Sequence, residues 1–251
     1  MTTTPQIKPI PIEALYTRWA PSYDQSHQNT VQGHDEIELA TLFPKFLSHI
    51  LSAPSAPPLK IIDFGCGTGR NTLKLLNLPS ATIVGLDATP QMIDLARRRC
   101  QERLASLPPD ARAAHVRCEI YNPLVQPTPP ECAREAGALI STLVVEHFTL
   151  PEFFEATGKL LRSGGFCMVT GVHSDLAQIS HPSIVDTDTG ELVWGATHVH
   201  SVEDVEKEAP KWGFEVLEVQ EGSPKDPDLV GANRGHWEGV KCWVGFLLRK
   251  K

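Results

Sequence analysis

Short apolar runs alternate with amphipathic stretches along most of the chain. Apolar runs bounded by turn residues are typical of buried strands, whereas apolar residues spaced three and four apart are typical of helices. The predicted strands are 60–64, 81–86, 114–121, a run from 138 toward 145, 166–170, 213–220 and 240–249. The predicted helices are 36–51, one that opens at 88–96, 151–162 with Ser163-Gly164-Gly165 as its stop, and 201–212.

This alternation of strands and helices predicts one α/β domain. The 251 residues, 41% of them hydrophobic, can bury one sizeable core, so no second domain is needed. Segments 52–58 and 122–130 are rich in proline and are expected to be a linker and an exposed loop. A long loop is expected at 222–239, between the last two strands.

A loop of alternating glycines, Gly65, Gly67 and Gly69, directly follows the first predicted strand. Only glycine enters left-handed conformations at little cost, so this backbone is suited to pass close beneath a ligand. The next strand ends in Asp87, whose carboxylate would reach the same ligand and could accept hydrogen bonds from both hydroxyls of a ribose. The dinucleotide fingerprint places its third glycine one position later, where this chain has Arg70. The loop therefore favours a nucleoside without a diphosphate.

Several segments match a known family in order. The run Asp63-Phe64-Gly65-Cys66-Gly67-Thr68-Gly69, the acid Asp87, the Glu146-His147 loop and the Ser163-Gly164-Gly165 turn resemble the class I S-adenosylmethionine (SAM) dependent methyltransferases. Within that class the chain is similar to small-molecule enzymes of the methyltransferase type 11/12 or UbiE-like group, over roughly residues 16–170. The resemblance implies a three-layer, doubly wound, mostly parallel seven-stranded sheet whose last strand is antiparallel. It also implies a single domain, 1–251, with an N-terminal helical lid over 1–51 and an acceptor-side insertion over 172–200.

The resemblance also implies which residues hold SAM or its product, S-adenosylhomocysteine (SAH). The expected cofactor contacts are Tyr16, Tyr23, Asp63, Gly65, Gly67, Gly69, Asp87, Ala88, Met92, Glu119 and Thr142. Met92 is expected to pack on adenine and the tyrosines to close over the methionine end, although each could equally be a core residue. After the third strand the chain departs from the family pattern. Three alternatives therefore stay open for the partner of the adenine amino group: Glu119, Asn122 or a backbone carbonyl.

The acceptor is expected to bind at the loops that follow the carboxyl ends of the strands. Displacement at the methyl of SAM by an O, N, S or C nucleophile needs mainly alignment and desolvation. A general base is useful only for a nucleophile of high pKa, and a histidine that titrates near neutrality would suit that role. The catalytic candidates are His147, His173 and His200, and the substrate-binding candidates are Glu146, Trp194 and His198. No metal site is predicted, because the histidine spacing matches no known ligand pattern.

Composition narrows the class of protein. The formal net charge of -7 leaves no broad basic field for nucleic acid, and Arg97-Arg98-Arg99 is expected to be a solvated helix face. The chain shows no long apolar run or targeting segment, so a cytoplasmic protein away from membranes is expected, with the nucleus left open. Six dispersed cysteines without a C-x-x-C pair are expected to be reduced and mostly buried, including Cys66 in the glycine loop.

The leading hypothesis is a SAM-dependent methyltransferase that transfers a methyl group to an O, N or S atom of a small organic acceptor. One alternative is a protein side-chain methyltransferase in a regulatory complex, and another is a SAM-binding regulator without turnover. A nicotinamide oxidoreductase ranks last because of Arg70. A protein partner or a homodimer stays open.

Overall fold

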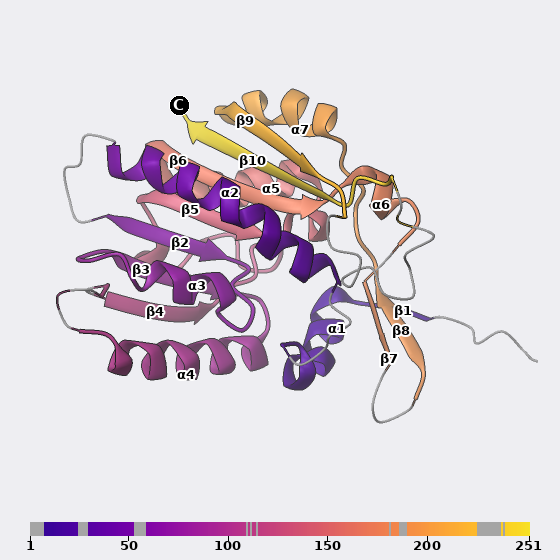
Figure 1. Ribbon diagram of the computed structural model, residues 1–251, viewed down its shortest axis with the longest axis horizontal. Coiled ribbons are helices and arrows are strands. Elements are labelled where there is room, and N and C mark those ends of the chain that lie inside the picture. Colours follow the sequence, from indigo (N-terminus) through magenta and orange to yellow (C-terminus); the bar gives the residue numbers. More distant parts are fainter. Residues whose placement is uncertain are drawn as a thin grey trace, which may run out of the picture.

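The computed structural model describes residues 8–24, 30–52, 59–108, 110, 112–113, 115–180, 182–185, 190–224, 237 and 239–251. A central seven-stranded sheet has the order β4-β3-β2-β5-β6-β10-β9 (Figure 1). Its strands are β2 (Lys60–Phe64), β3 (Thr82–Asp87), β4 (His115–Ile120), β5 (Ala136–Thr142), β6 (Leu161–Val172), β9 (Phe214–Gly222) and β10 (Trp243–Lys250). The last strand, β10, runs antiparallel to both β6 and β9, and the other neighbouring pairs are parallel. The predicted sheet is confirmed.

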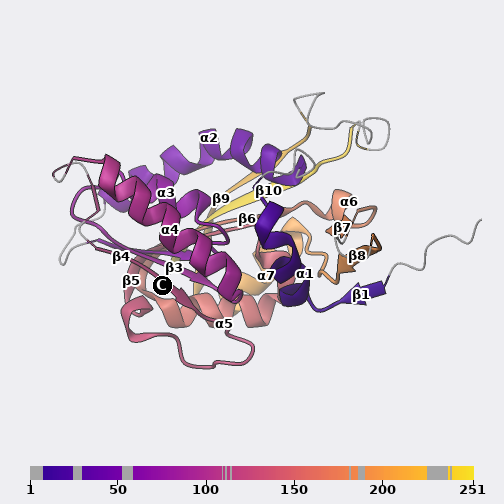
Figure 2. The same cartoon turned by 90° about the horizontal axis from the view of Figure 1, so that it is seen from below.

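Helices cover both faces of this sheet, which gives three layers (Figure 2). One face carries α2 (Thr30–Ser52), α3 (Arg70–Leu75) and α4 (Pro90–Ser106), and the other carries α5 (Leu150–Leu160) and α7 (Val202–Glu208). Successive strand residues point to opposite faces, so Ile61 joins the core beneath α2 to α4 while Ile62 joins the core beneath α5. Two-sided burial explains why β2 and β3 are continuous apolar runs rather than alternating ones.

Two predicted element boundaries are wrong. The helix expected at 151–162 ends at Leu160, and β6 begins at Leu161, so the glycine turn lies within a strand. Leu161 pairs with Ala136 of β5, and the register between β5 and β6 shifts after this pair. The chain therefore continues as a strand where the end of a helix was expected. The helix expected at 201–212 divides into α7 and a 3₁₀ turn, Ala209–Trp212, where Pro210 cannot donate a helical hydrogen bond. Most of the predicted 222–239 loop lies outside the described residues.

The segment predicted as a helical lid, 1–51, includes α2, which packs on the sheet; the lid itself stays a prediction. Leu39, Leu42 and Phe46 of α2 are buried against the sheet, because their spacing places them on one helix face. The helix that lies beyond the carboxyl ends of the parallel strands is α1 (Ile12–Trp19), followed by a 3₁₀ turn, Ala20–Ser22. The part of the N-terminal segment that covers the end of the sheet is therefore short.

A second, three-stranded sheet lies beside α1 and was not predicted from the sequence (Figure 1). Its strands are β1 (Lys8–Ile10), β8 (Leu192–Gly195) and β7 (Ser183–Val185); β1 is parallel to β8, and β7 is antiparallel to it. A short helix, α6 (Ser174–Ala177), precedes β7. A Cβ atom at Gly195 would lie 2.4 Å from Ile12 Cδ1, so glycine lets α1 pack directly on β8. This small sheet joins the N-terminal segment to the predicted acceptor-side insertion.

Within the described part of the chain, no helix combines the length and the apolar content needed to cross a membrane.

Candidate active site

The glycine loop between β2 and α3 is held against two neighbouring strands. The N–H groups of Gly65 and Cys66 both donate to the carbonyl of Leu86, at 2.7 and 2.9 Å. Gly65 has a φ of 74°, and a Cβ atom there would lie 2.2 Å from Val144 Cγ2. Only glycine therefore fits between the end of β3 and the segment after β5. This packing fixes the loop at the carboxyl edge of the sheet.

Asp87, at the end of β3, binds the loop from the other side. Its carboxylate accepts hydrogen bonds from the N–H of Gly67 at 2.9 Å and from the N–H of Thr89 at 2.8 Å. Burial raises the pKa of Asp87, while the two backbone donors and the side chain of Thr89 act in the opposite direction. A carboxylate has about four lone-pair sites, so these three donors leave acceptor capacity for a ligand. The acid thus orders the loop and keeps acceptor capacity.

A first pocket opens above this loop. It is bounded by the end of β3, the start of α4, the segment after β5 and α1. Of the predicted cofactor contacts, the following line it: Tyr16, Tyr23, Gly65, Gly67, Asp87, Ala88, Met92 and Thr142. Tyr121 and Asn122 also line it, and the amide of Asn122 donates to Glu13 of α1 at 3.0 Å. The sequence thus identified most of one side of this pocket.

Three predicted cofactor contacts lie outside the lining of the first pocket. Asp63 is buried beneath the loop, accepts a hydrogen bond from Thr72, and has its pKa raised by burial to about 6. Gly69 precedes α3 as its N-cap, where a φ of 88° requires glycine. Glu119 lies on the outermost strand, with its Oε2 atom 3.7 Å from Nη2 of Arg97 in α4, and its contact with the cofactor stays a prediction. The first two support the loop rather than line the pocket.

A second pocket adjoins the first. It is lined by Tyr16, Trp19, Tyr23, Val31, Leu143, Glu146, His147, Val172, Leu176, Ala177, Ser180, Pro182, Ser183, Thr197, His198 and Trp237. Tyr16, Tyr23, Leu143 and His147 line both pockets and form the boundary between them. Leu143 has a φ of 57°, a conformation that is rare for a non-glycine residue and often found at functional sites. No sequence signal marked Leu143, because its conformation follows from the surrounding chain.

His147 lies at this boundary and contacts α1. Its Nε2 atom is 3.0 Å from the hydroxyl of Tyr16, and the two rings meet edge to face at 5.4 Å. Burial lowers the pKa of His147 to about 4. The sequence led us to expect a base that titrates near neutrality, whereas burial favours the uncharged form of His147; its catalytic role stays a prediction. Burial also raises the pKa of Tyr16 well above its usual value, so the pair is neutral.

Glu146 contributes a buried carboxyl group to the second pocket. The residue is 7% exposed, and its Oε2 atom has no hydrogen-bond partner among the described residues. Burial raises the pKa of Glu146 to about 8. Its backbone carbonyl accepts from the N–H of His198 at 2.7 Å, which ties the predicted insertion to this turn. Glu146 and His198 thus occupy the second pocket, as candidates for acceptor binding.

The other acceptor-side candidates lie outside both linings. His173 is buried, accepts at Nδ1 from the N–H of Asp175 to cap α6, and lies 2.8 Å from Glu221 through Nε2. His200 contacts the carbonyl of Phe148 through Nε2 at 2.8 Å. Trp194 belongs to β8 of the small sheet. His173 and His200 thus make local contacts outside both linings, and their catalytic role stays a prediction. In the described ranges, no group of three or more His, Cys, Asp or Glu residues could hold a metal ion.

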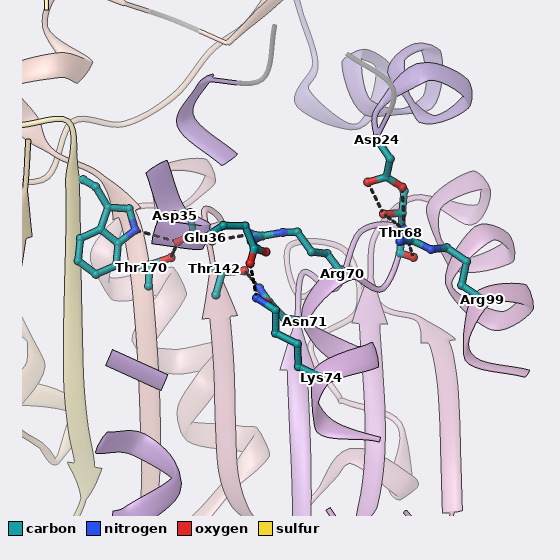
Figure 3. Close-up of polar contacts among 11 residues, drawn as sticks. Asp24, Asp35, Glu36, Thr68, Arg70, Asn71, Lys74, Arg99, Thr142 and Thr170 are labelled. Atoms are coloured by element: carbon teal, nitrogen blue, oxygen red, sulfur yellow. Dashed lines mark hydrogen bonds and ion pairs between the residues drawn. The ribbon is translucent and has the colours of Figure 1, made fainter. Parts of the chain in front are cut away.

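The end of the lid is bonded to the glycine loop (Figure 3). Asp24 accepts hydrogen bonds from the hydroxyl of Thr68 at 3.1 Å and from Arg99 of α4 at 2.7 Å. Arg99 also donates to the hydroxyl and the carbonyl of Thr68, at 2.9 and 3.2 Å. We call Asp24, Thr68 and Arg99 the lid latch. It joins the segment after α1 to the glycine loop and α4.

Replacing Asp24 with Ala is expected to weaken SAH binding by about 3- to 10-fold, since an exposed, hydrogen-bonded ion pair contributes about 1 kcal/mol. The thermal midpoint should change little, because the latch lies at the surface. Isothermal titration calorimetry measures the affinity, with Glu203→Ala, which removes another exposed ion pair, in α7, as control. Equal affinities in the two variants would show that the latch does not close the lid.

Replacing Glu146 with Gln is expected to stabilise the chain at pH 8. The pKa of the folded carboxyl is raised above that of the unfolded chain, so stability falls as the pH rises from about 4.5 to 8. Glutamine does not titrate and should remove this loss, a gain of roughly 1–3 kcal/mol at pH 8 that vanishes near pH 4. Thermal melts across this range, with exposed Glu155→Gln as control, test the expectation. An unchanged pH slope would contradict it.

Comparison with known proteins agrees with this geometry. The sequence model of a methyltransferase domain matches residues 61–165. An uncharacterized methyltransferase of Emericella nidulans is 34% identical over 261 residues, which cover 94% of this chain and 89% of the relative. The [4+2]-cyclase SpnF superposes with a TM-score of 0.65 at 16% identity, covering 99% of this chain and 98% of that one. The magnesium protoporphyrin IX methyltransferase of Synechocystis with bound SAH gives 0.59 at 15% identity, covering 94% of each chain.

Fold and site together define a Rossmann-like α/β enzyme with a nucleoside-binding glycine loop. The chain belongs to the class I SAM-dependent methyltransferases. The first pocket fits their cofactor: a Cβ atom at Gly67 would meet nothing within 4 Å, so the loop is open to the pocket, and Asp87, a half-buried acid with remaining acceptor capacity, lies beside it.

Proposed function

We propose that this methyltransferase transfers the methyl group of SAM to an O, N or S atom of a small organic acceptor bound in the second pocket. The observation that carries the proposal is the pair of adjoining pockets, which share Tyr16, Tyr23, Leu143 and His147. One pocket suits the cofactor and the other an acceptor, with direct contact between them. The magnesium protoporphyrin IX methyltransferase among the structural neighbours supports a small-molecule acceptor.

In the first pocket, Asp87 would accept hydrogen bonds from the ribose hydroxyls and Met92 would pack on the adenine. Tyr16 and Tyr23 lie at the boundary, where they would cover the methionine end. The bound cofactor supplies an activated methyl group on a sulfonium. The chain itself mainly aligns the acceptor and excludes water, since the leaving group needs no further activation.

The second pocket is enclosed by segments that are far apart in the sequence. Trp19 of α1, Leu176 of α6 and Ser183 of β7 line it from three elements. The lid latch and the Tyr16–His147 contact hold α1 over the site. These contacts would keep the acceptor next to the cofactor and away from bulk water, as a methyl-transfer site requires.

The proposal is tested with SAM that carries a labelled methyl group. The protein is incubated with whole-cell extract that has been separated into low-mass and protein fractions, and transferred label is measured in each. We expect label in the low-mass fraction, and none with Gly67→Val as control. Label confined to proteins would favour a side-chain methyltransferase. SAH binding without any transfer would favour a regulator. Either result would overturn the proposal.

A further inference from the structure

Two buried polar atoms without partners belong to adjacent residues that line the second pocket. Glu146 Oε2 and His147 Nδ1 have no hydrogen-bond partner among the described residues, and both side chains line the pocket. A buried polar group that makes no hydrogen bond costs free energy, so such groups usually have a role that the protein alone does not display. Glu146 Oε2 can accept a hydrogen bond, whereas His147 Nδ1 accepts or donates one according to which ring nitrogen carries the proton. A ligand that carries a donor would therefore supply the missing partner of Glu146.

The charge of the described lining restricts this ligand. The second pocket has no Lys or Arg among its described lining residues. It does have the carboxyl group of Glu146. A buried anion without a cationic partner is strongly unfavourable. This lining is unsuited to a carboxylate or phosphate acceptor and suited to a cation.

Aromatic rings complete the pattern. Tyr16, Trp19 and Tyr23 contact one another, with ring centroids 6.0, 6.0 and 4.9 Å apart, and all three line the second pocket. Ring faces attract cations, most strongly for tryptophan. Trp19 lines the second pocket and not the first, so its ring belongs to the acceptor side. Three aromatic rings and a carboxyl group form a typical environment for an ammonium group.

We infer that the acceptor is an amine that enters the second pocket as a cation, and that Glu146, rather than His147, binds its N–H and takes its proton. This inference rests on the proposed methyl transfer to a small acceptor at the same site. It assigns Glu146 as the residue that touches the reacting nitrogen, and Trp19 as a determinant of charge specificity.

The proton balance is consistent with this assignment. Because the buried Glu146 carboxyl is neutral below a pH of about 8, entry of the ammonium first displaces the carboxyl proton to solvent. The ammonium N–H then gives its proton to the resulting carboxylate, and the freed lone pair forms the C–N bond as the methyl–sulfur bond breaks toward sulfur. The methylated product keeps the positive charge, and Glu146 is again neutral. Burial favours the neutral form of both partners, since it raises the pKa of Glu146 to about 8 and would lower that of an amine. His147, with a lowered pKa, remains the partner of Tyr16.

Matched ligands that differ only in charge test the inference. The probes are benzylamine, benzyl alcohol and benzoate, with tryptamine, tryptophol and indoleacetate as a larger set, each added to the SAH-bound protein. We expect at least one amine to raise the thermal midpoint by about 3 °C at saturation, and its alcohol and carboxylate counterparts to have no effect. An equal response to the uncharged or anionic probes, or no response to any amine, would overturn the inference.

Variants separate this inference from the proposed function. Glu146→Gln is expected to abolish the amine-induced shift and to lower the rate of methyl transfer to that amine by about 100-fold or more, with SAH affinity unchanged. Trp19→Leu should weaken amine binding, and exposed Glu155→Gln should behave as wild type. Full transfer by Glu146→Gln would overturn the assignment while leaving the methyltransferase intact. Transfer of label to low-mass acceptors that are not amines would do the same.

Discussion

Substituting valine for Gly67 is expected to abolish SAM binding while the chain remains folded. Gly67 has a φ of 53°, and a Cβ atom there would point into open space at the first pocket. The valine side chain would therefore occupy the cofactor site rather than clash with the protein. A β-branched residue at this positive φ would also strain the backbone at position 67, whose N–H donates to Asp87 at 2.9 Å. We expect the affinity for SAH to fall by at least about 100-fold, as measured by isothermal titration calorimetry.

Gly164→Val is the matched control for this prediction. Gly164 has a φ of 76°, and its added Cβ atom would likewise meet nothing within 4 Å. It lies near the start of β6, away from the lining of both cofactor and acceptor pockets. Both variants carry the strain of a β-branched residue at positive φ, but only Gly67→Val fills the site. Equal SAH affinity in the two variants would overturn the placement of the cofactor.

The sequence was sufficient where the information is local. The spacing of apolar residues and the composition predicted the strands. The glycine loop and Asp87 predicted the first pocket, because a backbone that approaches a ligand needs glycine and because adjacent parallel strands end at one edge of the sheet. The boundary at Leu160 was wrong because glycines after a helix suggested a stop, whereas pairing of Leu161 with Ala136 continues the chain as a strand. Local signals cannot show such pairing.

The acceptor side depended on contacts between distant segments. Glu146 and His147 were chosen as site residues from their position after a strand, but their charge states follow from burial, which moves the two pKa values in opposite directions. Trp19 joins them only because β1 pairs with β8 and positions α1. His173 and His200 could not be distinguished from His147 by sequence, since their partners, Glu221 and Phe148, are 48 and 52 residues away.

A buried polar network that joins α2, α3 and the sheet was also absent from the prediction (Figure 3). Asp35 is fully buried and accepts hydrogen bonds from Arg70, from the hydroxyl of Thr170 at 2.7 Å and from the indole N–H of Trp243 at 2.8 Å. Arg70 starts α3 directly after the glycine loop and also pairs with Glu36. Arg70, whose place in the sequence argued against a dinucleotide ligand, thus connects the glycine loop to α2.

Asp35→Ala is expected to destabilise the folded chain by about 3–5 kcal/mol, since it leaves a largely buried guanidinium and two buried donors without their acceptor. Urea denaturation measures this loss. The matched control is Glu36→Ala, which removes the other carboxylate of Arg70 at a position 42% exposed and should cost about 1 kcal/mol or less. Equal losses would show that burial does not set the strength of this network. Because Arg70 adjoins the loop, the residual folded Asp35→Ala protein should also bind SAH more weakly than Glu36→Ala, which would link the stability of the core to the order of the cofactor site.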